Sequence, residues 1–457
     1  MITLTKELIS KYDEAGPRYT SYPTAPVWNS DFDSSKYVDT LEKFSRNPKP
    51  LSLYVHIPFC QKRCLYCACN VLIRKPNPAV GEDYIRYLGI EMELIKNRLG
   101  FKPTIQQIHI GGGTPTFLTD DQLSKLCLLL DQTFDMQTVQ EKSIEVDPRS
   151  VDSKRIQTLH RLGFNRLSFG IQDFDEQVQQ AVGREQLFSD VQTLFETARS
   201  CGFASINCDL IYGLPSQTLI RFGETIKKII DLMPDRIALY SFAHVPWIHS
   251  HQKLLDQSKF PSSDEKLALF FHARDQLFMN GYTAIAMDHF ALEKNELSVA
   301  YREGRLKRNF MGYTTLTTQN YLGLGVSSIG YLSNSFSQNT KDLKTYYTNL
   351  DKGVFPVEKG YVLSKKDLIN QWVISSLMCQ FQIDKKKFKA AFKEEFDTYF
   401  NSKSVFLDSC ENEHLIKHQK HMILVTELGL LFVRNICMRF DEYLSKNKKI
   451  SQFSRTV

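Results

Sequence analysis

The chain has 457 residues, 42% of them hydrophobic and 24% charged, a composition ordinary for a globular protein with a large buried core. Its length is long for one domain and suits two. The net charge of +6 and the pI of about 8.6 fall short of the Lys and Arg stripes of nucleic-acid-binding proteins, so we expect no nucleic-acid partner. A mildly basic chain would also suit an anionic small substrate.

Neither a membrane span nor a secretion signal is expected. No run of about 18 apolar residues occurs, and the first 12 residues carry charges through their middle and no apolar core. Buried free thiols explain six scattered cysteines better than a disulfide framework does. We therefore expect a cytoplasmic protein. The six are Cys127, Cys201, Cys208, Cys379, Cys410 and Cys437.

Residues 1–50 are mostly irregular. Residues 16–24 are dense in turn formers and tyrosines and include one arginine. Composition alone favours a surface arm for this stretch.

From residue 51 onward, strand-like segments alternate with amphipathic helices. Such alternation predicts an α/β fold with a parallel sheet and right-handed crossovers. Six units make a partial or full barrel, with ligands at the carboxyl ends of its strands. The expected strands are 51–57, 105–110, 143–146, 166–169, 206–212 and 236–242. The expected helices include 85–99 ended by Gly100, one opened by a Thr119–Gln122 capping box, one to about Leu162, and two near 187–201 and 218–231.

The rest of the chain is less regular. Ser262 and Glu265 form a second capping box, and 283–287 reads as a short strand. Residues 295–350 are rich in Tyr, Asn, Gly and Ser and permit no assignment. Beyond Gly360 the apolar spacing becomes helical. We therefore expect an N-terminal arm at 1–50, an α/β barrel with an extension at 51–350, and a smaller, mainly helical domain at 355–457.

Four cysteines follow the first expected strand: Cys60, Cys64, Cys67 and Cys69, spaced C-x3-C-x2-C-x-C. Thiolates suit zinc or iron–sulfur clusters. Structural zinc usually takes two ligand pairs well apart in sequence, whereas all four cysteines lie within ten residues here. Cys60, Cys64 and Cys67 would hold a cluster and leave one iron open for chemistry. Structural zinc remains the alternative, and Cys69 is either a spare ligand or a separate functional thiol.

A C-x3-C-x2-C loop after the first strand of a barrel resembles the radical S-adenosylmethionine enzymes. Ten further motifs occur in order along the chain, and together they resemble the family of oxygen-independent coproporphyrinogen III oxidases from one end to the other. The motifs are GPRYTSYPTA (16–25), YVHIPFC (54–60), GGGTPT (111–116), IEVDPR (144–149), GFNRLS (163–168), DLIYGLP (209–215), MDHFA (287–291), RNF (308–310), GVS (325–327) and QFSR (452–455).

This resemblance implies a radical-SAM partial (β/α)6 barrel with the N-terminal arm as part of its active-site cover. It also implies a [4Fe–4S] cluster on Cys60, Cys64 and Cys67, two S-adenosylmethionine molecules per chain, and a catalytic role for Cys69. Small departures from the family pattern occur at Tyr66, Ala68 and Gly183. The positions matching the first S-adenosylmethionine are Tyr54, Gly112, Glu145 and Ile329, and those matching the second are Tyr66, Gly113, Thr114, Gln172, Arg184, Asp209 and Ala243.

The implied reaction is hydrogen abstraction from a propionate β-carbon of coproporphyrinogen III by a 5′-deoxyadenosyl radical. Loss of carbon dioxide and one electron then leaves a vinyl group, and two rounds give protoporphyrinogen IX. Arg18, Arg302 and Arg308 are candidates for binding the propionates, because arginine makes a two-pronged contact with carboxylates.

The implied partners are an unidentified small electron-donor protein and an electron acceptor, and a monomer is expected. A haem-binding chaperone on the same scaffold is the alternative function. Such relatives usually lack a cysteine at position 69 and the Pro-Arg-Tyr arm, and both are present here.

Overall fold

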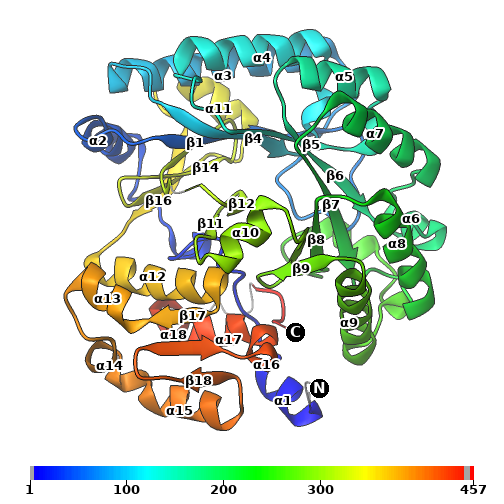
Figure 1. The fold of residues 1–457 in the computed structure, drawn as a ribbon. Coiled ribbons are helices and arrows are strands. Elements are labelled where there is room, and N and C mark those ends of the chain that lie inside the picture. The colour runs from blue at the N-terminus through cyan, green and yellow to red at the C-terminus, as the bar shows by residue number, and fades with distance from the viewer. Residues whose placement is uncertain (1–4, 317, 447–452, 457) are drawn as a thin grey trace.

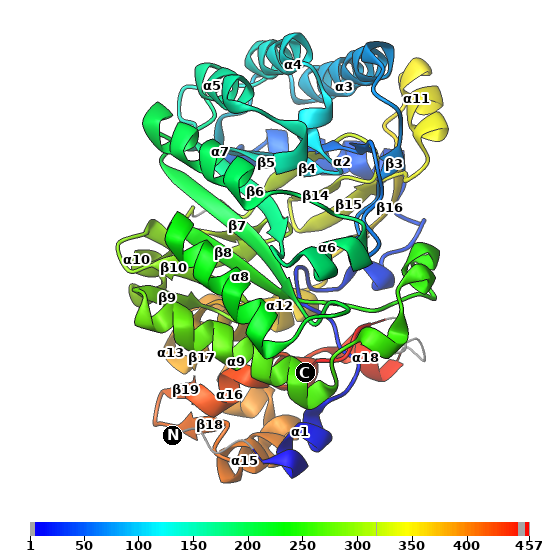
Figure 2. The same ribbon diagram turned by 90° about the vertical axis from the view of Figure 1, so that its right-hand side faces the viewer.

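A computed structural model describes residues 5–316, 318–446 and 453–456 of the chain. A 12-stranded sheet organises the larger part of the molecule and curves around a central space (Figures 1 and 2). In spatial order its strands are β16 (Val357–Val362), β15 (Ser335–Asn339), β14 (Ile329–Leu332), β13 (Tyr321–Leu324), β1 (Leu51–Ile57), β4 (Ile105–Gly112), β5 (Glu141–Val146), β6 (Arg166–Gln172), β7 (Ser205–Tyr212), β8 (Arg236–Ser241), β10 (His289–Leu292) and β9 (Tyr282–Ile285).

The six expected strands are β1, β4, β5, β6, β7 and β8, which lie next to one another and run parallel. β1 is buried on both faces, as expected for a parallel sheet covered by helices on one side and by the barrel interior on the other. The predicted partial (β/α)6 barrel is therefore confirmed.

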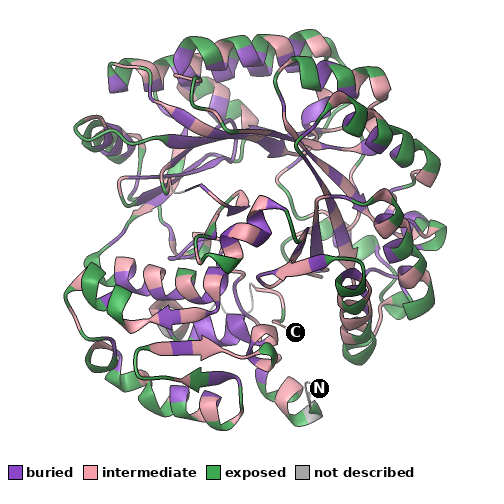
Figure 3. Cartoon of the chain, viewed as in Figure 1, coloured by how far each residue is buried: buried purple, intermediate pink, exposed green. Residues whose placement is uncertain are grey.

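Helices cover the outer face of this sheet, with buried residues towards the strands (Figures 1 and 3). Both predicted capping boxes are present, Thr119–Gln122 and Ser262–Glu265. Gly100 ends the first helix with a left-handed φ of +74°. The outer helices are α3 (Pro78–Leu99), α4 (Asp120–Thr133), α5 (Ser153–Arg161), α6 (Glu176–Val182), α7 (Phe188–Cys201), α8 (Leu219–Leu232) and α9 (Ser263–Met279).

The stretch that sequence left unassigned extends the sheet beyond β1. β13 runs parallel to β1 and places Gly323 beside Tyr54, and β14 to β16 continue antiparallel. β16 falls within the expected C-terminal domain, yet it is the edge strand of the large sheet. The other elements of the stretch are α10 (Glu296–Arg302), β11 (Lys307–Asn309), β12 (Gly312–Thr314) and α11 (Leu343–Asp351).

A buried carboxylate joins α3 to this extension. The Glu91 side chain accepts hydrogen bonds from the Gly325 backbone N–H (2.8 Å), the Asn339 amide (2.6 Å) and the Tyr346 hydroxyl (2.7 Å). Glu91 is only 2% exposed. The nearby Tyr84 hydroxyl donates to the His56 carbonyl on β1. Glu91 therefore helps to hold the extension next to the strand that precedes the cysteine loop.

The C-terminal region has its own apolar core, in which Ile369, Val373 and Leu377 of the first helix are buried as their spacing predicted. A three-stranded sheet accompanies the helices. The helices are α12 (Lys365–Gln380), α13 (Lys385–Phe392), α14 (Phe396–Tyr399), α15 (Ser404–Asn412), α16 (Glu427–Leu431), α17 (Val433–Met438) and α18 (Glu442–Lys446). The strands are β17 (Gln382–Asp384), β18 (Ile416–His418) and β19 (Met422–Val425).

In the N-terminal arm, α1 (Lys6–Tyr12) and the tyrosines that follow it pack against this C-terminal core, whereas α2 (Ser34–Ser45) packs against α3 and the large sheet. Tyr19 and Tyr22 are buried, and the Gln371 side chain donates to the Tyr22 carbonyl at 3.0 Å. The prediction of a surface arm, which rested on composition alone, is therefore wrong, because the rings of Tyr19 and Tyr22 pack against apolar residues of distant helices. Residues 453–456 lie beside the arm, whereas Gln452 of the QFSR motif lies outside the described residues.

All ten cysteines are free thiols, and five of the six scattered ones are buried. No helix within the described part of the chain combines the length and the apolar character needed to cross a bilayer.

Candidate active site

A cavity of about 710 Å³ lies where the carboxyl ends of the barrel strands meet the cysteine loop. Most of the predicted site residues line it, although they come from separate strands and loops. They are Cys60, Cys64, Tyr66, Cys67, Cys69, Gly112, Gly113, Thr114, Glu145, Gln172, Arg184, Asp209 and Ala243.

The cysteine loop starts at β2 (Phe59–Cys60), which pairs with β3 (Leu72–Ile73). Cys60 Sγ is 3.3 Å from Thr114 Oγ1, and the Cys67 N–H donates to the Cys64 carbonyl. Among the described residues, no three Cys, His, Asp or Glu side chains are grouped to hold one metal ion. Cys60, Cys64 and Cys67 all line the cavity, where their thiolates could hold an iron–sulfur cluster.

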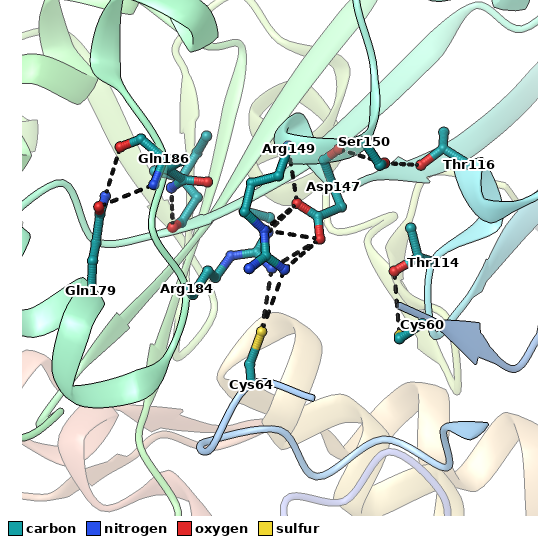
Figure 4. Close-up of polar contacts among 12 residues, drawn as sticks. Cys60, Cys64, Thr114, Thr116, Asp147, Arg149, Ser150, Gln179, Arg184 and Gln186 are labelled. Carbon is teal, nitrogen blue, oxygen red and sulfur yellow. Dashed lines mark hydrogen bonds and ion pairs between the residues drawn. The ribbon is translucent and has the colours of Figure 1, made fainter. Parts of the chain in front are cut away.

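The guanidinium groups of two arginines lie next to the sulfur of Cys64 (Figure 4). Arg149 Nη2 and Arg184 Nη1 each donate to Cys64 Sγ at 3.6 Å. Asp147 holds both guanidinium groups: it accepts from Arg149 Nη2 at 2.7 Å and from Arg184 Nη2 at 3.2 Å. Burial opposes ionisation of Asp147, but Arg184 and Arg149 together lower its pKa. Two cations with one anion between them therefore lie against a single cysteine sulfur.

Glu145 presents an ionised carboxylate at the end of β5. It accepts from the Gly112 N–H at 2.9 Å and contacts His109 Nε2 at 3.1 Å. The other ring nitrogen of His109 contacts Ser143 Oγ at 2.7 Å, which fixes the orientation of the imidazole. Burial opposes the charge of Glu145, but the His109 contact and the Gly112 hydrogen bond lower its pKa. This carboxylate is suited to hold a cation or hydroxyl groups.

The glycine triplet lets β4 end against the loop after β1. A Cβ on Gly112 would lie 2.6 Å from the His56 ring, and one on Gly113 would lie 2.8 Å from the Pro58 carbonyl group. Gly112 also has a φ of +121°, which disfavours any side chain. Bare backbone therefore borders the cavity at this point.

Gln172, Asp209 and Ala243, which come from or follow β6, β7 and β8, also line the cavity. Gln172 has a left-handed φ of +70° at a bulge where β6 and β7 change register. Burial, together with the nearby Glu145 charge, raises the pKa of Asp209 to about 6. The fully buried Gln252 donates to the carbonyls of Ala243 and Tyr66, each at 3.2 Å, and so ties this part of the cavity to the cysteine loop.

Two predicted residues do not line the cavity. The Tyr54 hydroxyl lies 2.9 Å from His56 Nδ1, and the Tyr54 ring stacks on His109. Ile329 is buried in a separate apolar cluster with Trp28 and Tyr331.

The three candidate arginines are placed differently. Arg18 lines the cavity, where its Nη2 donates to the Ser241 carbonyl at 2.7 Å. Arg308 lies behind it and donates to the Arg18 carbonyl at 2.8 Å. Arg302 is exposed, donates to the Glu293 carbonyl and does not line the cavity. The geometry therefore favours Arg18, with Arg308 as its support, over Arg302.

Sequence reasoning assigned no role to Asp147, Arg149, His109 and Gln252. The sequence did contain a signal for Asp147 and Arg149, because Asp147-Pro148-Arg149 directly follows a predicted strand within the motif IEVDPR (144–149). No motif marked His109 or Gln252: the partners of His109 lie on the next strand of the sheet, and the contact of Gln252 with Tyr66 spans 186 residues.

Comparison with known proteins agrees with this geometry. Residues 54–229 match the radical SAM superfamily, and residues 363–432 match the HemN C-terminal domain. A solved structure described as coproporphyrinogen III oxidase from Escherichia coli, a radical SAM enzyme, superposes with a TM-score of 0.90 at 39% identity, covering 97% of this chain and 99% of that one. The fold and cavity are thus those of a radical SAM enzyme, which uses a [4Fe–4S] cluster and S-adenosylmethionine.

Relatives named oxygen-independent coproporphyrinogen III oxidase match along the whole length. The protein from Synechocystis is 41% identical, covering 100% of this chain and 98% of its own. The protein from Helicobacter pylori is 39% identical, with both chains fully covered. The chain therefore belongs to the oxygen-independent coproporphyrinogen III oxidase family.

The residues around the cavity fit these cofactors. Soft thiolates suit iron, the glycine backbone leaves open space, and Glu145 presents an anion to the cavity for a cationic ligand. The structure thus supplies sulfur ligands for the cluster and an open cavity for S-adenosylmethionine.

We expect the substitution Arg149→Gln to lower the reduction potential of the cluster, because it removes a cation and a hydrogen-bond donor next to a proposed ligand thiolate. A redox titration followed by electron paramagnetic resonance on anaerobically purified protein measures this potential. The control Arg199→Gln breaks an ion pair with Asp235 on the outside of the barrel and should leave the potential unchanged. Equal potentials in the Arg149→Gln variant and the unmodified protein would contradict the expectation.

Proposed function

We propose that this protein catalyses the oxygen-independent oxidative decarboxylation of two propionate side chains of coproporphyrinogen III to vinyl groups, giving protoporphyrinogen IX. The observation that carries the proposal is full-length identity of about 40% to enzymes of that name. The cavity supports it, since residues from many strand ends meet there as the family pattern requires.

In this proposal Cys60, Cys64 and Cys67 hold the cluster. Gly112 and Glu145 serve the first S-adenosylmethionine, together with Tyr54 and Ile329, which do not line the cavity. The chemistry that the bound cofactors supply is hydrogen-atom abstraction by an adenosyl radical. The residues proposed for a second S-adenosylmethionine are Tyr66, Gly113, Thr114, Gln172, Arg184, Asp209 and Ala243.

The chain's own contribution is placement and the exclusion of water. Glu145, oriented by His109, offers an anion for the ammonium or ribose hydroxyls of a cofactor. Arg18 offers a cation for a propionate, and the buried arm that carries it closes this side of the cavity. Cys69 lines the same cavity and is the proposed catalytic thiol.

The haem-binding chaperone is the weaker alternative. Cys69 lies at the cavity, and the Pro17–Arg18–Tyr19 arm is packed in place, with Arg18 reaching the strand ends. Both features are ones that the chaperone relatives usually lack. The proposal further places the enzyme in the cytoplasm as a monomer that receives electrons from a small donor protein.

The deciding experiment uses protein purified without oxygen, with iron and sulfide measured first. Reductant, S-adenosylmethionine and coproporphyrinogen III are then added, and the porphyrinogens and 5′-deoxyadenosine are quantified. Both 5′-deoxyadenosine and protoporphyrinogen IX are expected. Formation of 5′-deoxyadenosine without any vinyl product would show that the substrate is wrong, and zinc without iron would overturn the whole proposal.

A further inference from the structure

The cysteine loop lies in a stretch with only positive charges. Residues 58–81 contain four cations, Lys62, Arg63, Arg74 and Lys75, and no Asp or Glu. Within the described part of the chain no ion pair involves any of the four. Arg63 and Arg74 donate instead to the backbone carbonyls of Val71 and Ile73, which leaves their charges uncompensated. Lys62, Arg74 and Lys75 are exposed, so the loop carries a free positive charge at the surface.

Backbone pairing places part of this charge next to a proposed cluster ligand. β2 and β3 pair Cys60 with Ile73, and the Arg74 N–H donates to the Cys60 carbonyl at 2.9 Å. Arg74 and Lys75 are thus the first two residues after β3, the strand that pairs with the strand containing Cys60.

A second segment adds exposed apolar side chains beside the same loop. Trp247 is 61% exposed, Ile248 52% and Leu254 73%. This segment is fastened to the cysteine loop, because the His251 imidazole lies 2.7 Å from the Cys67 carbonyl and Gln252 donates to the Tyr66 carbonyl. Three large exposed apolar groups within the eight residues 247–254 are unusual for a surface with no partner.

We propose that these two features form one docking surface for a small acidic one-electron carrier protein. The surface consists of Arg74 and Lys75, the basic rim, and of Trp247, Ile248 and Leu254, the apolar patch. The inference rests on the proposed function, which needs one electron for each cofactor cleavage. In the complex the carrier loses one electron and the cluster gains it, and no atoms are exchanged.

Charge and position together select this partner. A basic rim whose charges form no ion pair within the described residues attracts an acidic protein and speeds its association, and salt weakens the attraction. The apolar patch supplies the buried contacts that hold a protein partner in place. A second copy of this chain fits poorly, because the two basic rims would repel each other. The surface also lies against backbone that carries Cys60 and Cys67, so a docked carrier would lie close to the cluster.

The test compares two reductants on the reconstituted holoenzyme. The probe carrier is a small acidic flavodoxin reduced beforehand, and dithionite is the small-molecule reductant that needs no docking. The test variants are R74E/K75E in the basic rim and W247S/L254S in the apolar patch, none of which lines the cavity. The rate of 5′-deoxyadenosine formation is measured against carrier concentration, and iron content verifies that each variant folds and holds its cluster.

Matched controls make the same changes far from the loop. K386E/K387E reverses two adjacent exposed lysines on α13, and L128S/V405S replaces exposed apolar residues on α4 and α15.

We expect R74E/K75E to raise the KM for the carrier by ~10-fold or more and to flatten its salt dependence. W247S/L254S should also raise this KM, while both controls and all dithionite-supported rates stay at the unmodified level. An unchanged KM for the carrier in both test variants would overturn the proposal. An equal loss of the rate of 5′-deoxyadenosine formation with dithionite would also overturn it, because that result would mean that the substitutions damage the active site itself. Failure of the proposed function is a separate result: no vinyl product from the unmodified protein with dithionite.

Discussion

The substitution Cys64→Ser is expected to remove the iron–sulfur cluster and to reduce turnover to background. A serine hydroxyl stays protonated near neutral pH and is a poor iron ligand, so one corner of the cluster would lose its attachment. Cys64 is also the buried sulfur to which Arg149 and Arg184 donate, so its loss leaves the buried guanidinium group of Arg184 and the more exposed one of Arg149 without that partner. Iron and sulfide analysis, the visible absorption of the cluster and 5′-deoxyadenosine formation are the measurements.

Cys69→Ser separates two roles for the fourth cysteine. Because Cys69 is proposed as a catalytic thiol and not as a ligand, we expect this variant to keep its iron and lose turnover. Cys201→Ser, at a half-buried thiol on α7, is the control and should keep both. Loss of iron from the Cys69→Ser variant would identify Cys69 as a ligand. Full iron content in Cys64→Ser would contradict the assignment of Cys64.

The second large effect is expected at Glu91, far from any thiol. Glu91→Ala leaves the Gly325 N–H, the Asn339 amide and the Tyr346 hydroxyl without their buried acceptor, which should cost ~3–5 kcal/mol of unfolding free energy. The midpoint of urea unfolding measures the loss. Glu93→Ala, at an exposed position on the same helix, is the control and should change the free energy by less than about 0.5 kcal/mol.

Glu91→Gln tests the charge separately from the hydrogen bonds. Burial raises the pKa of Glu91 above its ordinary value of 4.5. The folded protein therefore binds this proton more tightly than the unfolded chain, and its stability falls as pH rises upward from about 4.5. Glu91→Gln should lose that part of the pH dependence and be less destabilised than Glu91→Ala. A Glu91→Ala variant as stable as the Glu93→Ala control would contradict the role assigned to Glu91.

Sequence alone determined the barrel units and the chemistry of the cysteine loop. The apolar run of β1, the capping box at Thr119 and the left-handed stop at Gly100 each depend on residues within a few positions of one another. Such short-range patterns express backbone periodicity and end-capping, so they can be read without a structure. The spacing of Cys60, Cys64 and Cys67 is local in the same way and already indicated an open cluster.

Tertiary structure decided what surrounds that loop. Arg149 and Arg184 meet at Cys64 from 85 and 120 residues away, and β13 joins β1 from a stretch with no readable pattern. Composition suggested that the arm lies on the surface, yet its tyrosines are buried against helices more than 300 residues further along the chain. These contacts depend on which distant segments pack together, and periodicity marks the buried face of an element but not the element that covers it. The cysteines could therefore be identified from sequence, whereas the charges that surround Cys64 could not.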